Sequence, residues 1–359
     1  MSSSKSLTPL LPPSYTLHTQ TLLTSLWSNY GYIHRVTLTT PSNPTPTPCI
    51  LKHIRPPPAS SSCHATESHL RKLISYRVER YFYTNLSHPL PSDTTKVASR
   101  YDVAGEHIDD ALLLEDLTRG FPLRAPHTLP LGKTQSVIRW LAGFHATFWN
   151  HTDIPLIPPP NEVREPNTAE GVWAQGGYWY LATRSEEYAS LEDSQEEEYT
   201  WLTPYALPIA EKLKTETLGR TLLHGDVKGA NILFSKTVPR GDAQEEVKCA
   251  LYDFQYVGSG LGVVDLAYFL GTTVDERDLR GGEKEEGLLR LYFEEVESVL
   301  KERGMVMGGY TWEALVQQWE WALVDWMRFM AGWGCWGNSG WVERRAEEIC
   351  ARWRREGGL

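Results

Sequence analysis

The sequence lacks paired cysteine motifs, long apolar runs and an excess of basic residues. Its five cysteines are an odd number without a Cys-x-x-Cys pair, which argues against a disulfide framework and against a zinc site. No uninterrupted apolar run approaches the roughly 20 residues that span a bilayer. A formal net charge of −10 gives no electrostatic reason to bind nucleic acid or an anionic membrane. We therefore expect neither kind of partner.

The opening stretch MSSSKSLTPLLPPS lacks the basic region and the long apolar region of a secretory signal peptide. We expect a soluble, cytoplasmic protein. The alternative for this Ser-rich stretch is an organelle transit segment, against which stands its lack of Arg.

What the chain does contain suggests two lobes of unequal size. In the first part, the β-branched stretch at 33–38 and CILKHI at 49–54 predict a hairpin around a Pro/Thr-rich turn. A helical pattern follows at 68–86, and the apolar strand ALLLEDL lies at 111–117. We predict an α+β fold with a small β-rich N-lobe at 1–117 and a larger, mainly helical C-lobe at 118–359.

The C-lobe pattern is mainly helical. The stretch at 135–149 predicts a core helix in which His145 is a hydrogen-bonded core residue. Tryptophans spaced by seven residues from Trp312 to Trp333 predict a further helix with Thr311 as its N-cap. The acidic run at 190–199 has no His or Gly punctuation and predicts a solvated helix face or loop.

Chemistry is carried by LLHGDVKGANILF at 222–234 and by ALYDFQ at 250–255. Phosphoryl transfer from ATP to a hydroxyl needs a carboxylate near the attacking oxygen and metal ions that bridge the phosphates. Asp226 in a loop is suited to orient or deprotonate the acceptor. Asn231 offers a neutral oxygen and Asp253 a charged one, and Mg²⁺ prefers such hard ligands. The polar stretch between these two residues predicts two strands joined by a loop.

These residues resemble the aminoglycoside phosphotransferase and choline kinase group, in particular its ecdysteroid-kinase-like branch. The resemblance rests on His224 to Asn231 as HGDxxxxN, on Asp253-Phe254-Gln255, and on Asp265-Leu266-Ala267. It implies a bilobal protein-kinase-like fold and ATP- and Mg²⁺-dependent transfer to a hydroxyl of a small molecule. Asp265 is expected to tie its helix to the catalytic loop, and His224 to pack structurally.

The resemblance also implies positions in the small lobe. Lys52 in CILKHI is expected to hold the α- and β-phosphates, and Glu79 in the following helix to orient it. Backbone groups from Glu115 to Leu117 are expected to form the hinge that meets adenine. The phosphate loop is assigned to Ser28, Asn29 and Gly31, although a GxGxxG pattern is lacking.

Several alternatives stay open. Lys228 either contacts the γ-phosphate or is a solvated loop lysine. The chain is either an enzyme, a catalytically silent pseudokinase that serves as a binding module, or a protein kinase. Against a protein kinase stand the missing Gly-rich loop and the short path from Asp253 to Asp265, which leaves no room for an activation loop.

The acceptor is expected between the catalytic loop and the C-terminal helices, where tryptophans are frequent. Most of them are expected in the core, while one or two, with Asp325 or Glu320, line a pocket for an apolar or amine-bearing alcohol. Choline is disfavoured, because choline kinases tend to have Asp-Phe-Glu where this chain has Asp-Phe-Gln.

Overall fold

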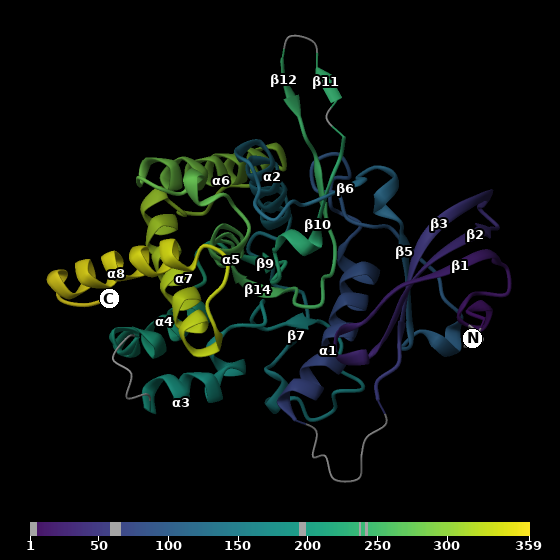
Figure 1. Cartoon of the computed structure of the whole chain (residues 1–359), viewed down its shortest axis with the longest axis horizontal. Helices are drawn as coiled ribbons and strands as arrows, with labels where there is room; N and C mark the ends of the chain where they lie inside the picture. The colour runs from purple at the N-terminus through teal and green to yellow at the C-terminus, as the bar shows by residue number, and fades with distance from the viewer. Residues whose placement is uncertain (1–5, 58–65, 194–198, 237, 241–242) are drawn as a thin grey trace.

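The computed structural model describes residues 6–57, 66–193, 199–236, 238–240 and 243–359. The chain forms a small lobe around one sheet and a larger lobe made mainly of helices, which lie at opposite ends of the molecule (Figure 1). The expected fold class, α+β with two lobes of unequal kind, is confirmed.

The sheet of the small lobe has five antiparallel strands in the order β1-β2-β3-β5-β4. They are β1 (Thr16–Ser25), β2 (Gly31–Thr40), β3 (Asn43–Ile54), β4 (Arg100–Tyr101) and β5 (Ala111–Glu115). β3 begins at Asn43, so the Pro/Thr-rich stretch expected to be a turn lies mostly inside this strand. Prolines are tolerated there because this stretch meets only β2, while β5 pairs with the other end of β3.

Alternation along the strands gives this sheet two different faces. Leu51 and Leu113 point to one face, where they pack with Leu7, Leu10 and Leu11 of the N-terminal segment. Because successive side chains of a strand point to opposite faces, Lys52 lies on the other face of β3. There the sheet is covered by helix α1 (Glu67–Tyr81), which Thr66 caps by accepting a hydrogen bond from the His69 N–H.

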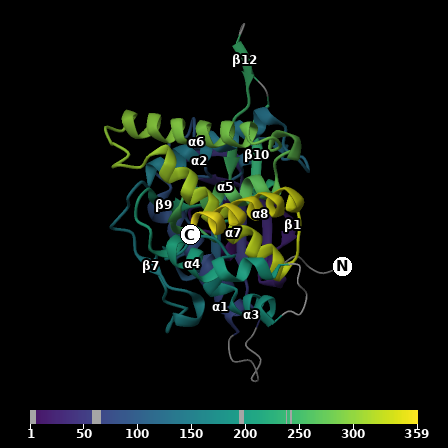
Figure 2. The same ribbon diagram turned by 90° about the vertical axis from the view of Figure 1, so that its left-hand side faces the viewer.

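The larger lobe contains seven α-helices among its described residues, and α2 and α6 pack side by side (Figures 1 and 2). They are α2 (Leu131–Thr147), α3 (Ser185–Asp193), α4 (Thr203–Thr215), α5 (Val263–Thr272), α6 (Glu283–Glu302), α7 (Trp312–Trp333) and α8 (Ser339–Glu356). α5 has the most apolar sequence of the seven and is almost fully buried beneath α7. Through Asp265 it also contacts the backbone of the HGDxxxxN motif.

Short strands in the larger lobe carry the loops of the expected site. β6 (Leu123–Arg124), β10 (Ile232–Phe234) and β13 (Cys249–Leu251) form one sheet, and β7 (Leu156–Ile157), β8 (Val172–Trp173), β9 (Arg220–Leu223) and β14 (Gly258–Leu261) form another. Within the stretch expected to be a loop, β11 (Val238–Arg240) and β12 (Ala243–Glu246) form a hairpin that projects from the lobe (Figure 1).

The tryptophan helix and its cap are confirmed, since α7 begins at Trp312 and Thr311 accepts a hydrogen bond from the Ala314 N–H. Trp319 and Trp326 are buried in the lobe. The stripe is not buried along its whole length, because Trp333 is 55% exposed at the end of the helix. Of the acidic run, 194–198 lie outside the described residues.

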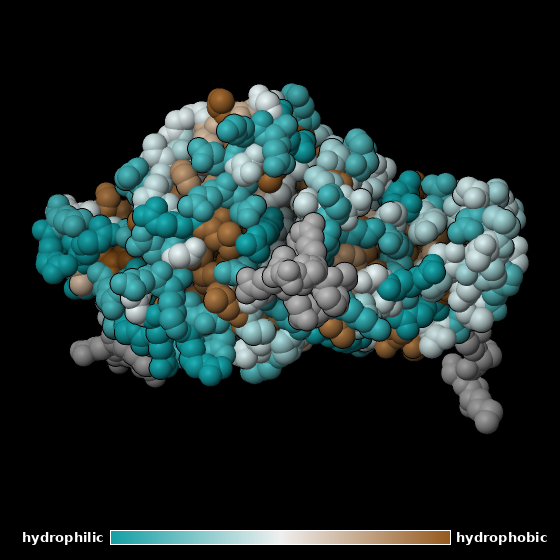
Figure 3. Space-filling model, turned by 90° about the horizontal axis from the view of Figure 1, so that it is seen from above, coloured by the Kyte–Doolittle hydropathy of each residue, from teal (hydrophilic) through white to brown (hydrophobic). Residues whose placement is uncertain are grey.

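The face seen in Figure 3 is mostly hydrophilic, with small groups of hydrophobic residues between the polar ones. In the described part of the chain, no helix has both the length and the apolar character needed to cross a bilayer. Cys49, Cys249, Cys335 and Cys350 are all free thiols.

Phe254 joins the two lobes through aromatic packing. Its ring stacks on that of Phe82, which directly follows α1, with centroids 3.9 Å apart and planes at 13°. It also contacts Tyr83 edge-on and lies 4.6 Å from the His224 ring. Both Phe82 and Phe254 are fully buried.

We predict that Phe254→Ala lowers the free energy of unfolding by about 3–5 kcal/mol, because it leaves a cavity where the two lobes meet. Denaturant unfolding followed by circular dichroism measures the change. Trp27→Ala is the control, since Trp27 is 81% exposed and its loss should cost roughly 0.5 kcal/mol or less. Equal losses in the two variants would contradict the packing role of Phe254.

Candidate active site

The HGDxxxxN motif lies on the loop between β9 and β10, and helix α5 holds the backbone of this loop. Asp265, in the first turn of α5, accepts hydrogen bonds from the His224 N–H (2.7 Å) and the Gly225 N–H (2.9 Å). Gly225 has φ 81°, and a Cβ there would lie 2.2 Å from the Tyr256 carbonyl oxygen. The glycine of HGD is therefore required by the tight turn and the close approach. The contacts of Asp265 agree with its expected anchoring role.

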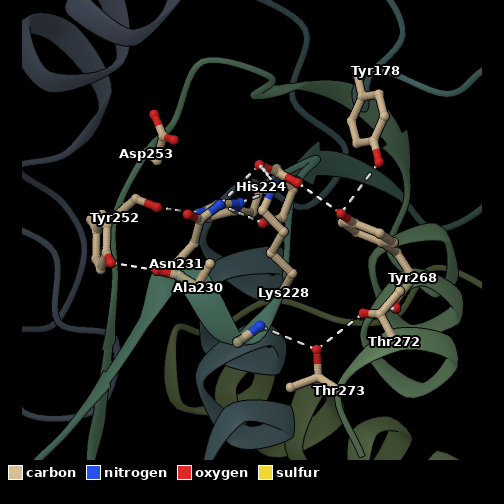
Figure 4. A network of polar contacts seen from close by, with 12 residues as sticks. Tyr178, His224, Lys228, Ala230, Asn231, Tyr252, Asp253, Tyr268, Thr272 and Thr273 are labelled. Carbon is tan, nitrogen blue, oxygen red and sulfur yellow. Dashed lines mark hydrogen bonds and ion pairs between the residues drawn. The ribbon is translucent and has the colours of Figure 1, made fainter. Parts of the chain in front are cut away.

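The Asp226 carboxylate is nearly buried and is held on both of its oxygens (Figure 4). Oδ1 accepts a hydrogen bond from the Tyr268 hydroxyl at 3.0 Å. Oδ2 accepts one from the Asn231 amide at 2.9 Å and lies 2.9 Å from Lys228 Nζ. Although burial opposes it, the Asp226 carboxylate raises the pKa of Lys228, so this lysine is charged at neutral pH.

His224 is a structural histidine, as its contacts show. Its Nδ1 accepts a hydrogen bond from the Asp226 N–H at 3.2 Å, and its Nε2 lies 3.2 Å from the Tyr252 carbonyl oxygen, to which it donates. One accepting and one donating nitrogen define a neutral imidazole. Burial lowers the pKa of His224, which agrees with that state. His145 is likewise buried and bonded, to the Tyr292 hydroxyl and to Asp265.

The strand register brings the two expected metal ligands together. β10 and β13 pair antiparallel with Ile232 opposite Leu251, and the Tyr252 N–H donates to the Asn231 carbonyl oxygen. Asn231 thus lies across from Tyr252, one residue before Asp253. The backbone of Asp253 is left-handed, with φ 72°, a conformation that costs of order 1–3 kcal/mol in a residue other than glycine and that is found mainly at functional sites.

Lys52 connects Asp253 to the small lobe. Its ammonium group lies 2.6 Å from Glu79 Oε1 and 3.1 Å from Asp253 Oδ1, and the side chain is only 7% exposed. Although burial opposes it, the carboxylates of Asp253 and Glu79 raise the pKa of Lys52. Burial alone would raise the pKa of Asp253, but Lys52 holds it below its ordinary value. Asp253 is therefore ionised, as a metal ligand must be.

The donors present fit a Mg²⁺ ion. Both N–H groups of the Asn231 amide point at Asp226, to its carbonyl oxygen and its carboxylate, which turns Asn231 Oδ1 away from that residue. Asp253 uses Oδ1 for Lys52 and has Oδ2 to offer. The described residues contain no cluster of three His, Cys, Asp or Glu side chains arranged for a metal. The expected site is of another kind, since one amide and one carboxylate oxygen suffice when phosphate oxygens complete the shell.

The expected phosphate loop is the connection from β1 to β2. Ser28 and Asn29 have left-handed backbones, and a Cβ on Gly31 would lie 2.0 Å from the His53 carbonyl oxygen. The loop is therefore a tight turn that leads into β2 directly beside β3, the strand of Lys52.

Several polar groups of the expected hinge are already hydrogen-bonded to neighbouring residues of the chain. The Glu115 N–H donates to the Ser99 carbonyl oxygen (2.8 Å), and the Glu115 carboxylate binds Lys96 (2.6 Å). The Leu117 carbonyl oxygen accepts from the N–H groups of Gly120 and Phe121. The Glu115 N–H and the Leu117 carbonyl oxygen thus already have partners within the chain. An adenine contact at 115–117 remains a prediction, and it would use the other backbone N–H and C=O groups of this segment.

The motifs did not point to two residues at this site, Tyr268 and Tyr178. Tyr268 contacts Asp226, and its hydroxyl lies 3.4 Å from that of Tyr178 (Figure 4). The sequence could have indicated Tyr268, because it follows Asp265 by three residues and therefore lies on the same face of the helix. Tyr178 lies far from every motif in sequence and had no such signal.

Comparison with known proteins supports the resemblance stated from the motifs. Residues 180–305 match the model of the ecdysteroid kinase-like family. This segment contains the HGDxxxxN loop, Asp253 and α5. The family resemblance is therefore confirmed over this part of the chain. No curated protein matches the chain.

The chain is also similar to solved structures. An ethanolamine kinase of Plasmodium vivax is 13% identical, with 94% of this chain and 82% of that chain covered and a TM-score of 0.43. A choline kinase of Cryptosporidium parvum is 11% identical, with coverages of 94% and 89% and a TM-score of 0.47. An aminoglycoside phosphotransferase of Streptomyces rimosus, solved with ADP and streptomycin, is 12% identical, with coverages of 84% and 91% and a TM-score of 0.38. Likenesses of this size do not identify a substrate.

We predict that Asp253→Asn weakens binding of a non-hydrolysable ATP analogue with Mg²⁺ at least about tenfold, because it removes the one charged oxygen of the proposed ligand pair. Calorimetry with and without Mg²⁺ measures this, and nucleotide affinity in the variant should lose its dependence on the metal. Lys52→Met is the matched control, since it weakens nucleotide binding but leaves the metal dependence. An unchanged metal dependence in Asp253→Asn would exclude the metal role.

Proposed function

We propose that the chain is a small-molecule kinase, which transfers the γ-phosphoryl group of ATP to a hydroxyl of a small metabolite and depends on Mg²⁺. One observation carries the proposal: the fold brings Lys52, Glu79 and Asp253 into one ion cluster, with Asn231 and Asp226 on the adjacent loop. These residues come from four separate parts of the sequence and supply the parts that phosphoryl transfer needs.

Each residue has a role in the proposed reaction. The acceptor oxygen bonds to the γ-phosphorus, the bond from that phosphorus to the β–γ bridging oxygen breaks, and ADP leaves. The acceptor proton passes to Asp226 Oδ1, which accepts only the Tyr268 hydroxyl among the described contacts and so retains a lone pair. Lys52 would bind phosphate oxygens, Glu79 orients Lys52, and Asn231 and Asp253 would hold a Mg²⁺ ion. Mg²⁺, when bound, neutralises charge on the phosphate oxygens.

Lys228 is proposed to act beside Asp226. Its ammonium group lies 2.9 Å from Asp226 Oδ2, and its side chain is 42% exposed. A charged lysine at this place is able to meet the transferred phosphoryl group as it approaches the acceptor. The contact to Asp226 favours this reading over a lysine that is simply solvated.

Two rival functions are less well supported by the geometry. A pseudokinase would not need a paired Lys52 and Glu79, an ionised Asp253 and a positioned Asp226 all at once. A protein kinase would need an activation segment, but β14 begins at Gly258 and α5 at Val263, so the chain returns to the core soon after Asp253.

The acceptor is proposed to meet the aromatic side chains beside Asp226. Tyr178 lies 5.4 Å from Tyr256 and 5.7 Å from Phe329 between ring centroids. The faces of Tyr178, Phe329 and Trp333 are already opposed by the guanidinium of Arg184, at 5.6, 5.7 and 4.7 Å. Because a cation of the protein occupies this position, the structure favours an uncharged apolar alcohol over an amine-bearing one.

The acidic residues expected to help hold an amine are engaged elsewhere. Asp325 is buried and paired with Arg328 at 2.7 Å, and Glu320 is paired with Arg352. This agrees with an uncharged acceptor.

We predict that Asp226→Ala lowers the turnover number by about 10²- to 10⁴-fold and leaves binding of the ATP analogue nearly unchanged, because the residue addresses the acceptor and not the nucleotide. ADP release at saturating acceptor and calorimetry of the nucleotide measure the two effects. Asp226→Asn, which keeps the shape but not the charge, should behave alike. Near-normal turnover in either variant would rule out the role of Asp226.

An ADP-release screen with Mg²⁺ and ATP tests the acceptor, with sterols, uncharged aliphatic alcohols, amino alcohols, aminoglycosides and sugars as separate arms. We expect turnover with the apolar uncharged alcohols. In Arg184→Met, which frees the ring faces, turnover of amino alcohols should rise relative to them. Turnover of sugars alone would contradict the aromatic acceptor site, preference of the wild type for amino alcohols would contradict the role of Arg184, and no turnover with any acceptor would favour the pseudokinase.

A further inference from the structure

Helix α5 and the residue that follows it present three side chains to the loop that carries Asp226. Asp265 accepts from two backbone N–H groups of the loop, and Thr273, just after the helix, accepts from the Gly229 N–H at 3.1 Å. Between these two, Tyr268 donates its hydroxyl to Asp226 Oδ1 at 3.0 Å (Figure 4). Tyr268 is the member of the three that contacts the side chain of the proposed base and not the loop backbone.

We propose that Tyr268 is a positioning residue, which fixes the orientation of the Asp226 carboxylate so that one lone pair of Oδ1 faces the acceptor. The inference rests on the proposed function. The terminal torsion of an aspartate is broad and roughly two-fold, so a carboxylate that is held by one oxygen alone can still tilt. Asn231 and Lys228 hold Oδ2, and Tyr268 holds Oδ1, which removes that freedom.

The direction of the hydrogen bonds follows from the chemistry of the two phenols. Burial, with Asp226 nearby, raises the pKa of Tyr268 well above its ordinary value, so its hydroxyl keeps its proton. A phenol has one proton to donate. Since Tyr268 gives it to the charged oxygen of Asp226, the 3.4 Å contact with Tyr178 can only be donated by Tyr178. Tyr178 therefore supports Tyr268 and contacts Asp226 only through it.

The contact of its hydroxyl with Asp226 distinguishes Tyr268 from other buried tyrosines, and this difference can be tested by substitution. Its ring is buried against Trp326, with centroids 4.9 Å apart, so Tyr268→Phe keeps the packing and removes only the hydroxyl. Tyr205 offers a matched control, because it is also buried and its hydroxyl donates to the Cys350 carbonyl oxygen, between α4 and α8. Both variants lose one buried hydroxyl, but only one of them loses a contact to Asp226.

The kinetic test uses the acceptor with the highest turnover in the screen. In Tyr268→Phe we expect kcat to fall about tenfold, the scale of one hydrogen bond to a charged group, with KM for MgATP within roughly twofold of wild type. Tyr178→Phe should show a smaller loss, and Tyr205→Phe none. In an Asp226→Ala background, Tyr268→Phe should cause no further loss, because the two residues act as one unit. An unchanged kcat in Tyr268→Phe, or an equal further loss in the Asp226→Ala background, would overturn the inference.

A second measurement does not depend on catalysis. Tyrosine labelled with ¹³C at the ring carbon that bears the hydroxyl gives one NMR signal per residue, and the signal missing in Tyr268→Phe identifies Tyr268. We expect this signal to move in Asp226→Asn, which removes the charged acceptor, while the Tyr205 signal stays in place. If the Tyr268 signal does not move, the inference fails whatever the chain catalyses. A wild-type chain that turns over no acceptor contradicts the proposed function instead, and the two failures are thus distinguishable.

Discussion

The ion cluster of Lys52, Glu79 and Asp253 is the contact on which the site depends, because it joins three segments that are far apart in sequence. Lys52 and Asp253 are 201 residues apart, and they belong to different lobes. Removing one partner from a buried ion pair leaves an unpaired charge and costs about 3–5 kcal/mol, whereas replacing the whole pair by apolar residues is often neutral. As a whole, the cluster therefore adds little net free energy of folding compared with apolar residues in the same place, although the loss of a single member is costly. Its effect is to fix where the sheet of the small lobe stands relative to the strand that carries Asp253.

The larger lobe has its own fixed point, which is helix α5. Burial of this helix beneath α7 places Asp265 and Tyr268 behind the catalytic loop, and the loop backbone is bonded to Asp265 at two consecutive N–H groups. The neutral His224 adds a third link, from the loop to the Tyr252 carbonyl oxygen. Loops usually have few contacts and move readily. Here the loop is held at its backbone by groups that are themselves buried, so Asp226 is positioned by the core of the lobe.

The sequence predicted the residues of this site that belong to short motifs, but not the contacts that depend on tertiary packing. Short motifs and the resemblance pointed to Lys52, Glu79, Asn231 and Asp253. The β10–β13 register brings Asn231 towards Asp253, and ion pairs join Lys52 to Glu79 and to Asp253. The contact of Tyr178 with Phe329 was not predictable, since Tyr178 lies far before α7 in the chain and meets this helix only through tertiary packing. The burial of α7 was predicted from the spacing of its tryptophans. The exposure of Trp333 was not, because periodicity does not show at which residue the neighbouring elements stop packing against a helix. The β11–β12 hairpin was missed for a related reason: a polar stretch with Gly and Pro is typical of loops and of exposed hairpins alike.

Charge balance explains how two carboxylates stand next to each other in the site. Asp226 and Asp253 lie on adjacent loops, and like charges at short range disfavour ionisation of both. Each is matched by a lysine: Lys52 at 3.1 Å from Asp253, and Lys228 at 2.9 Å from Asp226. The matching lysines differ in burial, since Lys52 is 7% exposed and Lys228 is 42% exposed. The buried lysine is fixed by a second carboxylate, that of Glu79. The exposed lysine has no such second carboxylate among the described contacts, so its ammonium group is less tightly fixed than that of Lys52.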